Sequence, residues 1–138
     1  MRIEIDGVAR LATEKRAAVA QVNGLADQVR RMFITPIIGQ EMVYLEKEAE
    51  ARRFLAEDPE PEDLAAYPFI AAEVGVSAVT AQQVAQLYLN LGAQWRVVGS
   101  ALENVRLGSI AAIEAATTLA QISAAVDGAA AAVGQFQP

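Results

Sequence analysis

The chain has 138 residues, of which 54% are hydrophobic and 20% are charged, and its formal net charge is -6. This length corresponds to about one domain, and the apolar fraction is far too high for a disordered segment. It contains no cysteine and no histidine, which excludes disulfides, thiolate nucleophiles, Cys-based metal sites and the commonest general base and metal ligand. The acidic balance argues against nucleic-acid binding, because neutralising phosphates requires a surplus of Lys and Arg.

Within residues 1–7, apolar and acidic side chains alternate over residues 3–6 and the pattern stops at Gly7, which is typical of a short strand with one covered face. Two interpretations stay open for this segment. It could add as a strand to the sheet edge of another chain, or it could be an extended arm or the fraying start of the first helix. Acids at Glu4 and Asp6 interrupt the apolar stretch that a secretory signal needs, so we expect no signal peptide.

A heptad seam of mainly apolar and small side chains follows and predicts a long amphipathic helix. Sustained over about three and a half heptads, it is at the lower limit of what indicates a coiled coil. Lys15 occupies a seam position, where it would weaken packing while fixing register or oligomeric state. The alternative is an ordinary helix that packs on its own domain. The seam comprises Val8, Leu11, Lys15, Ala18, Val22, Leu25, Val29 and Met32.

This helix should end before Pro36, because the residue that precedes a proline is pushed out of the helical region. A second helix is expected from about Gln40 to Glu57, followed by a solvated, proline-containing connection over residues 58–63. Pro68 suits the first turn of a short helix that Gly75 would end. The apolar stripe of the second helix comprises Met42, Leu45, Ala49, Phe54 and Leu55.

Thr80-Ala81-Gln82-Gln83 has the capping-box form and precedes an apolar periodic run. It predicts a helix from Ala81 to about Leu107, roughly 40 Å long, with a bend or a continuation at Gly108-Ser109. Gly92 and Gly99 within this run would either admit a close neighbouring helix or be merely tolerated. Thr118 to Gln121 repeats the capping box and should start a terminal helix that reaches Val126.

The tail, residues 129–138, has little to bury, and we expect it to be extended or mobile unless a partner orders it through Phe136. Residues 107–138 carry few charges, but their Ala, Gly, Ser and Thr content is unlike that of a membrane span.

The acid-rich stretch over residues 41–63 does not have the pattern of a metal or catalytic site. An EF-hand loop needs a central Gly, whereas Pro59 and Pro61 lie here and no Gly separates Asp58 from Asp63. A glycosidase pair needs two acids that face one cleft, and these acids are predicted on exposed helix faces or in the loop. We therefore expect no catalytic, cofactor-binding or metal-binding residues, no small-molecule substrate and no enzyme activity.

The predicted fold is all-α, an antiparallel helical bundle with a long N-terminal helix. We expect residues 1–34 to serve partner docking or oligomerisation, residues 35–127 to form the bundle and residues 128–138 to be a flexible tail. In the bundle, one set of side chains should pack on the stripe of the second helix. The set comprises Trp95, Val98, Leu102 and Val105, and it faces Met42, Leu45, Phe54 and Leu55.

Two stretches of the sequence form a recognisable pattern when they are taken together. The first, residues 31–44, has an aromatic, Ile-Thr, a short turn, Gly-Gln, a Met and a Tyr, and the Glu/Ala-rich residues 47–51 follow. The second, residues 67–118, begins with Tyr67-Pro68 and ends in an Ala-rich run. In order and spacing they resemble a segment of tail and tail-fibre-associated proteins of tailed bacteriophages and the helical domain of unknown function that follows it. The resemblance covers roughly residues 30–125 and departs at Ile37-Ile38, where that family usually has small residues.

This resemblance implies a non-enzymatic structural or accessory role in a virion tail, assembled in the host cytoplasm, and supplies no catalytic residues. Two alternatives stay open, a tail-fibre assembly chaperone and a polysaccharide hydrolase that uses Asp and Glu alone. The expected partners are other tail or fibre proteins, and we also expect a homo-oligomer. The predicted partner-binding residues are Ile3, Ile5, Val8, Leu11, Val22, Leu25, Val29, Met32 and Phe136.

Overall fold

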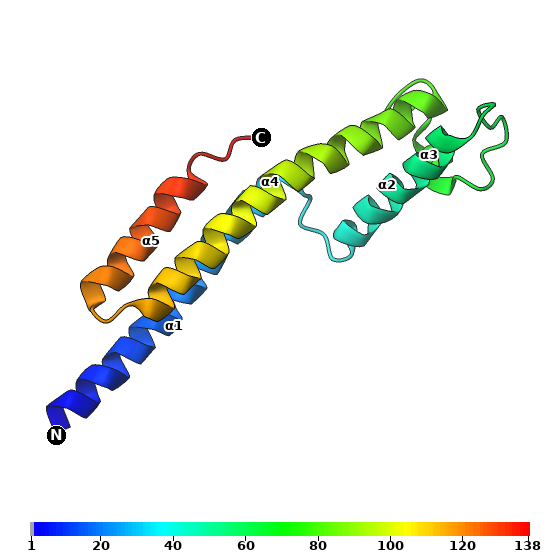
Figure 1. Ribbon diagram of the computed structural model, residues 1–138. Helices are drawn as coiled ribbons and strands as arrows, with labels where there is room; N and C mark the ends of the chain where they lie inside the picture. The colour runs from blue at the N-terminus through cyan, green and yellow to red at the C-terminus, as the bar shows by residue number, and fades with distance from the viewer. Residues whose placement is uncertain (1) are drawn as a thin grey trace. The chain divides into compact units, whose positions relative to one another are not determined.

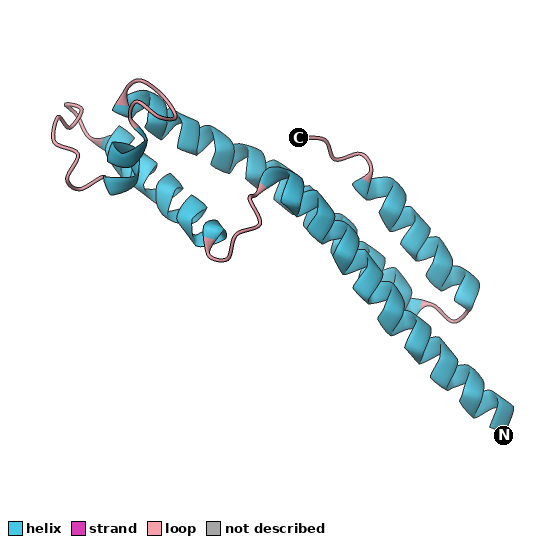
Figure 2. Ribbon diagram, turned by 180° about the vertical axis from the view of Figure 1, so that it is seen from behind, coloured by secondary structure: helices cyan, strands magenta, loops and turns pink. Residues whose placement is uncertain are grey.

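The computed structural model describes the backbone of residues 2–138 and the side chains of residues 6–138. This part of the chain contains five α-helices and no β-strand (Figure 1, Figure 2), which confirms the predicted all-α fold. It divides into two compact units, unit 1 with Met1–Phe33 and Val98–Pro138, and unit 2 with Ile34–Val97. The helices are α1 (Arg2–Phe33), α2 (Gln40–Ala56), α3 (Pro68–Glu73), α4 (Ala81–Ala115) and α5 (Leu119–Val133).

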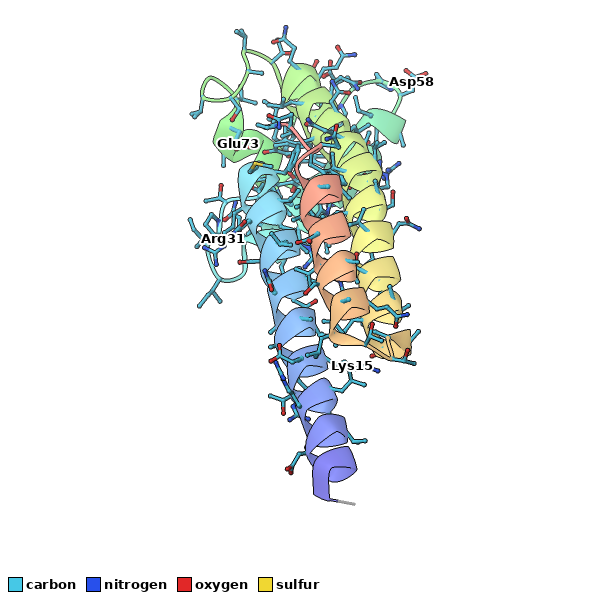
Figure 3. The ribbon with its side chains drawn as sticks, turned by 90° about the vertical axis from the view of Figure 1, so that its left-hand side faces the viewer. Lys15, Arg31, Asp58 and Glu73 are labelled. Carbon is cyan, nitrogen blue, oxygen red and sulfur yellow. The ribbon has the colours of Figure 1, made fainter. Side chains whose placement is uncertain are left out.

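Unit 1 is a bundle of α1, α5 and the second half of α4, in which α4 runs antiparallel to the other two helices (Figure 1). Val22 of α1 and Ile113 of α4 are buried in its larger apolar cluster, and Leu102 of α4 is buried in a smaller one. The seam residue Lys15 lies beside the end of α4 (Figure 3), where its Nζ donates to the carbonyl oxygen of Glu114 at 2.7 Å. That carbonyl belongs to the last turn, whose oxygens lack helical partners, so Lys15 caps α4.

Unit 2 packs α2 and α3 against the first half of α4, with Phe54, Ile70 and Val84 fully buried between them. Tyr67 presents its ring edge-on to Phe54, with ring centroids 5.3 Å apart and an interplanar angle of 87°, a favourable aromatic geometry. As predicted, α3 starts at Pro68 and ends before Gly75, which adopts a left-handed conformation with φ of 81°.

Both predicted capping boxes form the expected N-caps. At the start of α4, the backbone N–H of Gln83 donates to Thr80 Oγ1 at 3.2 Å, and the backbone N–H of Thr80 donates to Gln83 Oε1 at 3.1 Å. At the start of α5, the backbone N–H of Gln121 donates to Thr118 Oγ1 at 3.1 Å. Each cap satisfies N–H groups that the first turn of a helix leaves open.

The amino-terminal end differs from the strand interpretation, because α1 already begins at Arg2. The alternation over residues 3–6 is short, and a strand would need another strand for its backbone hydrogen bonds. Beginning α1 at Arg2 instead lets the carbonyl oxygens of these residues accept hydrogen bonds from N–H groups one turn further along the same helix. Of the interpretations left open for residues 1–7, the start of the first helix is therefore the one observed for residues 2–7.

The last helix is longer than the sequence predicts. Helix α5 continues past Asp127-Gly128 to Val133, because Ala129 is buried and Val133 packs on the smaller cluster of unit 1. The prediction of an extended or mobile tail is thus wrong for residues 129–133. At Gly108-Ser109, of the two alternatives left open, the continuation is observed: α4 runs on to Ala115, since Ile110 and Ile113 pack in the bundle.

The predicted packing of the second helix is wrong, because the helix is rotated about its own axis relative to the expected orientation. Met42 and Leu45 are exposed, whereas Phe54 is buried. Leu45 and Phe54 are about two and a half turns apart at 3.6 residues per turn, so they lie on opposite faces and one neighbour cannot cover both. Leu102, expected to face this helix, instead packs on Ala26 and Val29 of α1.

The division of the chain differs correspondingly from the expected one. Residues 1–33 form a compact unit together with residues 98–138, and α4 contributes to both units. The long-range contact between α1 and α5 accounts for this, because it joins the two ends of the chain in one core. Within residues 2–138, none of the helices combines the length and the apolar character needed to cross a membrane.

We predict that Ile113→Ala lowers the free energy of unfolding by about 2–5 kcal/mol, because it removes a fully buried side chain and leaves a cavity. Chemical denaturation followed by circular dichroism measures this change. Leu107→Ala in the same helix is the control, since Leu107 is 53% exposed and should lose less than about 1 kcal/mol. Equal losses in the two variants would contradict the observed packing of α4.

Candidate interaction surfaces

The first described turns of α1 extend beyond the other helices of unit 1 (Figure 1). Side chains 6–10 are all exposed, with Val8 at 69%, and Leu11 is the first described side chain of α1 that packs on the core. Helices of about ten residues are marginal in water unless a packed face stabilises them. This segment, residues 6–10, is available to a partner and would gain stability from one; it is called the α1 extension below.

The other seam residues are used mainly within the chain. Val22 and Val29 are buried in unit 1, and Leu11 and Leu25 pack against its larger cluster. Met32 is 45% exposed near the end of α1. The structure therefore shows, for the centre of the seam, the alternative of a helix that packs on its own domain.

The remaining predicted contacts lie at the two ends of the chain. Phe136 packs against the smaller cluster of unit 1, beside Val29 and Leu102, so residues of this chain cover part of its ring. The side chains of Ile3 and Ile5 lie outside the described residues. Among the predicted partner-binding residues with described side chains, Val8 is the most exposed.

The inner face of α2 carries a buried carboxylate that sequence reasoning missed. Glu50 is 1% exposed, and its two carboxylate oxygens accept hydrogen bonds from the backbone N–H groups of Phe69 at 3.2 Å and Ile70 at 2.7 Å. These donors belong to the first turn of α3, where anions also interact favourably with the helix dipole. The expectation that the acids lie on exposed faces or in the loop is wrong for Glu50, because two donors compensate its loss of water.

Lys47 of α2, Glu73 of α3 and Tyr88 of α4 continue this polar face. Lys47 Nζ lies 3.0 Å from the Glu73 carboxylate and 5.2 Å from the centroid of the Tyr88 ring. The Tyr88 hydroxyl hydrogen-bonds to Glu73 and lies 3.0 Å from the carbonyl oxygen of Phe69. Charges paired in this half-buried setting hold three helices in register. Glycoside hydrolysis would instead need two carboxyl groups that face a common cleft.

Glu48 approaches α4 at Gly92. A Cβ on Gly92 would lie 2.5 Å from the Glu48 carboxyl carbon, so the glycine makes room for this carboxylate. Arg96 forms an ion pair with Glu48, and Arg52 Nη2 lies 2.8 Å from it. The hydrogen bond from Arg96 is the largest influence on the pKa of Glu48 and lowers it; Arg52 acts in the same direction, while desolvation opposes both. The close approach considered for Gly92 is thus observed, with a side chain in place of a helix backbone.

The outer face of α2 and the loop before it form an exposed apolar surface. Met42 and Leu45 are 71% and 69% exposed, and Ile37 and Ile38 in the loop are also exposed. Clustered apolar side chains of this kind are typical of protein interaction sites. We call these four residues the α2 patch. The signal that could have revealed it is the phase of the stripe, since Leu45 and Phe54 cannot both face inward.

An open hollow of about 320 Å³ lies between α1 and α5. Its floor includes Ala18, Ile122 and Val126, and its rim includes the exposed Glu14 and Asp127. Ligand sites usually combine an enclosed apolar cavity with a few convergent polar groups, whereas these rim carboxylates are in water. Among the described side chains, no group of three or more His, Cys, Asp or Glu residues is placed to hold a metal ion.

Comparisons with protein-family models, curated proteins and solved structures find no match to this chain. The geometry of these surfaces and the sequence pattern of residues 30–125 therefore provide the basis for inferring a function. The geometry offers two surfaces suited to contact with other proteins, the α1 extension and the α2 patch.

We predict that Arg96→Ala raises the pKa of Glu48 toward its ordinary value, because it removes the main hydrogen bond to the carboxylate. The native pKa is lowered, so ionised Glu48 stabilises the fold at neutral pH, and this contribution is lost as the pH falls through that pKa. NMR titration of the Glu48 carboxyl carbon measures the shift. Arg52→Ala should raise the pKa less, and an unchanged pKa in Arg96→Ala would contradict the ion pair.

Proposed function

We propose that this protein is a non-enzymatic structural or accessory component of a bacteriophage tail, where it binds another tail protein through the α1 extension. The observation that carries the proposal is the exposure of side chains 6–10 on a helix that continues beyond its own bundle. The tail location rests on the resemblance of residues 30–125 to tail-associated proteins.

The chemistry of the extension suits a helical or grooved partner. Val8 offers an apolar contact next to Leu11, three residues along the same face, while the opposite charges of Asp6 and Arg10 lie on the other side of the helix. A partner helix could continue the heptad seam from the point where the bundle of unit 1 stops covering it. Ile3 and Ile5, whose side chains lie outside the described residues, remain predicted apolar contacts with the partner.

We predict that the protein is present at stoichiometric level in purified particles of the phage that encodes it. Quantitative mass spectrometry of density-purified virions makes the measurement, with a known tail subunit as the internal standard. Absence from mature particles would reject a resident role. Co-purification with fibre chains before assembly, combined with absence from the virion, would instead indicate the chaperone alternative.

We further predict that Val8→Asp lowers incorporation into particles at least about tenfold, because it places a charge at the apolar centre of the contact, a loss of about 1.4 kcal/mol or more. Complementation of a phage that lacks the gene, followed by quantification in virions, tests this. Ala20→Asp is the matched control, since Ala20 is an exposed α1 residue within the bundle region. Equal incorporation of both variants would remove the α1 extension as the docking element.

A further inference from the structure

The outer face of α2 is arranged so that it complements itself. Its acidic side chains lie in the first part of the helix and its basic ones in the last part, with apolar side chains between them. All seven of these residues are exposed. The acidic residues are Glu41 and Glu46, the apolar residues are Met42, Leu45 and Ala49, and the basic residues are Arg52 and Arg53.

We propose that this face of α2 pairs with the same face of a second copy of the chain, in antiparallel orientation about a two-fold axis. With Leu45 opposite the partner's Ala49, Met42 lies opposite the partner's Arg52, whose aliphatic stem can cover the thioether. The same register places Glu41 opposite the partner's Arg53 and one residue along from the partner's Arg52. Two-fold symmetry repeats each of these contacts, so the surface needs no other partner to be complete.

The distribution of charge on this face favours a second copy of the chain as the partner, in the antiparallel orientation. A parallel pair would place acids beside acids and Arg residues beside Arg residues, whereas the antiparallel register sets Glu41 against the partner's Arg52 and the partner's Arg53 at each end of the contact. Ile38, in the loop directly before α2, is 104% exposed and adds an apolar side chain near this end of the contact. The inner face of α2 is unavailable for such pairing, because Glu50 and Lys47 are bound within unit 2.

The size of the surface sets the expected strength. Helix α2 has 17 residues and is therefore about 25 Å long, so a single pair of such helices falls at the low end of specific interfaces. We expect a dimer with a Kd on the order of 10–100 µM, formed by the isolated protein. This inference is independent of the tail role, because the purified chain tests it without any phage component.

Sedimentation equilibrium of the full chain between about 5 and 500 µM tests the dimer. Wild type should shift from monomer to dimer, and Leu45→Glu should stay monomeric over the whole range because it buries a charge at the centre of the contact. Val76→Glu is the matched control, since Val76 is 81% exposed and lies outside α2, and it should dimerise as wild type does. A monomeric wild type, or a Leu45→Glu variant that still dimerises, would overturn the proposal.

Charge reversal tests the antiparallel direction. Arg53→Glu should weaken the dimer at least about fivefold, and adding Glu41→Arg to it should restore affinity, because positions 41 and 53 of the two copies again carry opposite charges. Thermal unfolding of the monomer is the stability control, since the Arg53 guanidinium lies 5.5 Å from the centroid of the Tyr67 ring. A double variant that dimerises no better than Arg53→Glu would overturn the proposed register.

The absence of cysteine permits a direct test of proximity. An equimolar mixture of Leu45→Cys and Ala49→Cys chains should form the mixed disulfide on mild oxidation, because a disulfide requires Cα atoms within about 7 Å. A mixture of Leu45→Cys and Val76→Cys chains is the control for random collision. Mixed-disulfide yield no higher than in this control would count against the contact between Leu45 and the partner's Ala49.

Discussion

In unit 2, the Glu50 carboxylate accepts hydrogen bonds from two backbone N–H groups of α3, and burying it there sets the rotation of α2 about its axis. A buried charge is stable only when it is hydrogen-bonded, and these donors otherwise lack helical partners. Once Glu50 and Phe54 face inward, Lys47 follows on the same face and pairs with Glu73. The opposite face must then carry Met42 and Leu45 into solvent.

The α2 patch is thus a consequence of the hydrogen bonds and the ion pair that polar side chains form on the inner face of α2. A helix with an apolar inner face would leave charged residues outside, which is the usual amphipathic arrangement. Here polar groups are placed inside and given partners from two other helices. The apolar side chains that remain are free to contact another molecule, and the charges beside them give that contact direction.

Unit 1 is stabilised differently from unit 2, because its core is apolar and rich in small residues. Ala18, Ala26, Ala116 and Ala129 are all buried in it. Such side chains let helices approach closely but bury little area each, so binding of a partner to the folded state would add usefully to stability. If the chain dimerises through α2, each dimer presents two α1 extensions, and weak docking at each would be strengthened by avidity.

The candidate surfaces were recognised only in part from the sequence. Val8 was expected to contact a partner and is exposed in the α1 extension, whereas Val22 and Val29 have the same periodicity and are buried within the chain. Periodicity marks an apolar face, but it does not say whether the cover comes from the same chain or another one. For the same reason the exposed Met42 and Leu45 were assigned to the core.

What the sequence by itself determined is local. The two threonine caps, the end of α1 before Pro36 and the short helix from Pro68 to Gly75 depend on hydrogen bonds and dihedral angles within a few residues. Tertiary structure alone decided the rotation of α2, the extension of α5 to Val133 and the internal use of the heptad seam. These features depend on which distant surface covers a side chain, and burial by residues far away in the sequence leaves no signature in the local pattern.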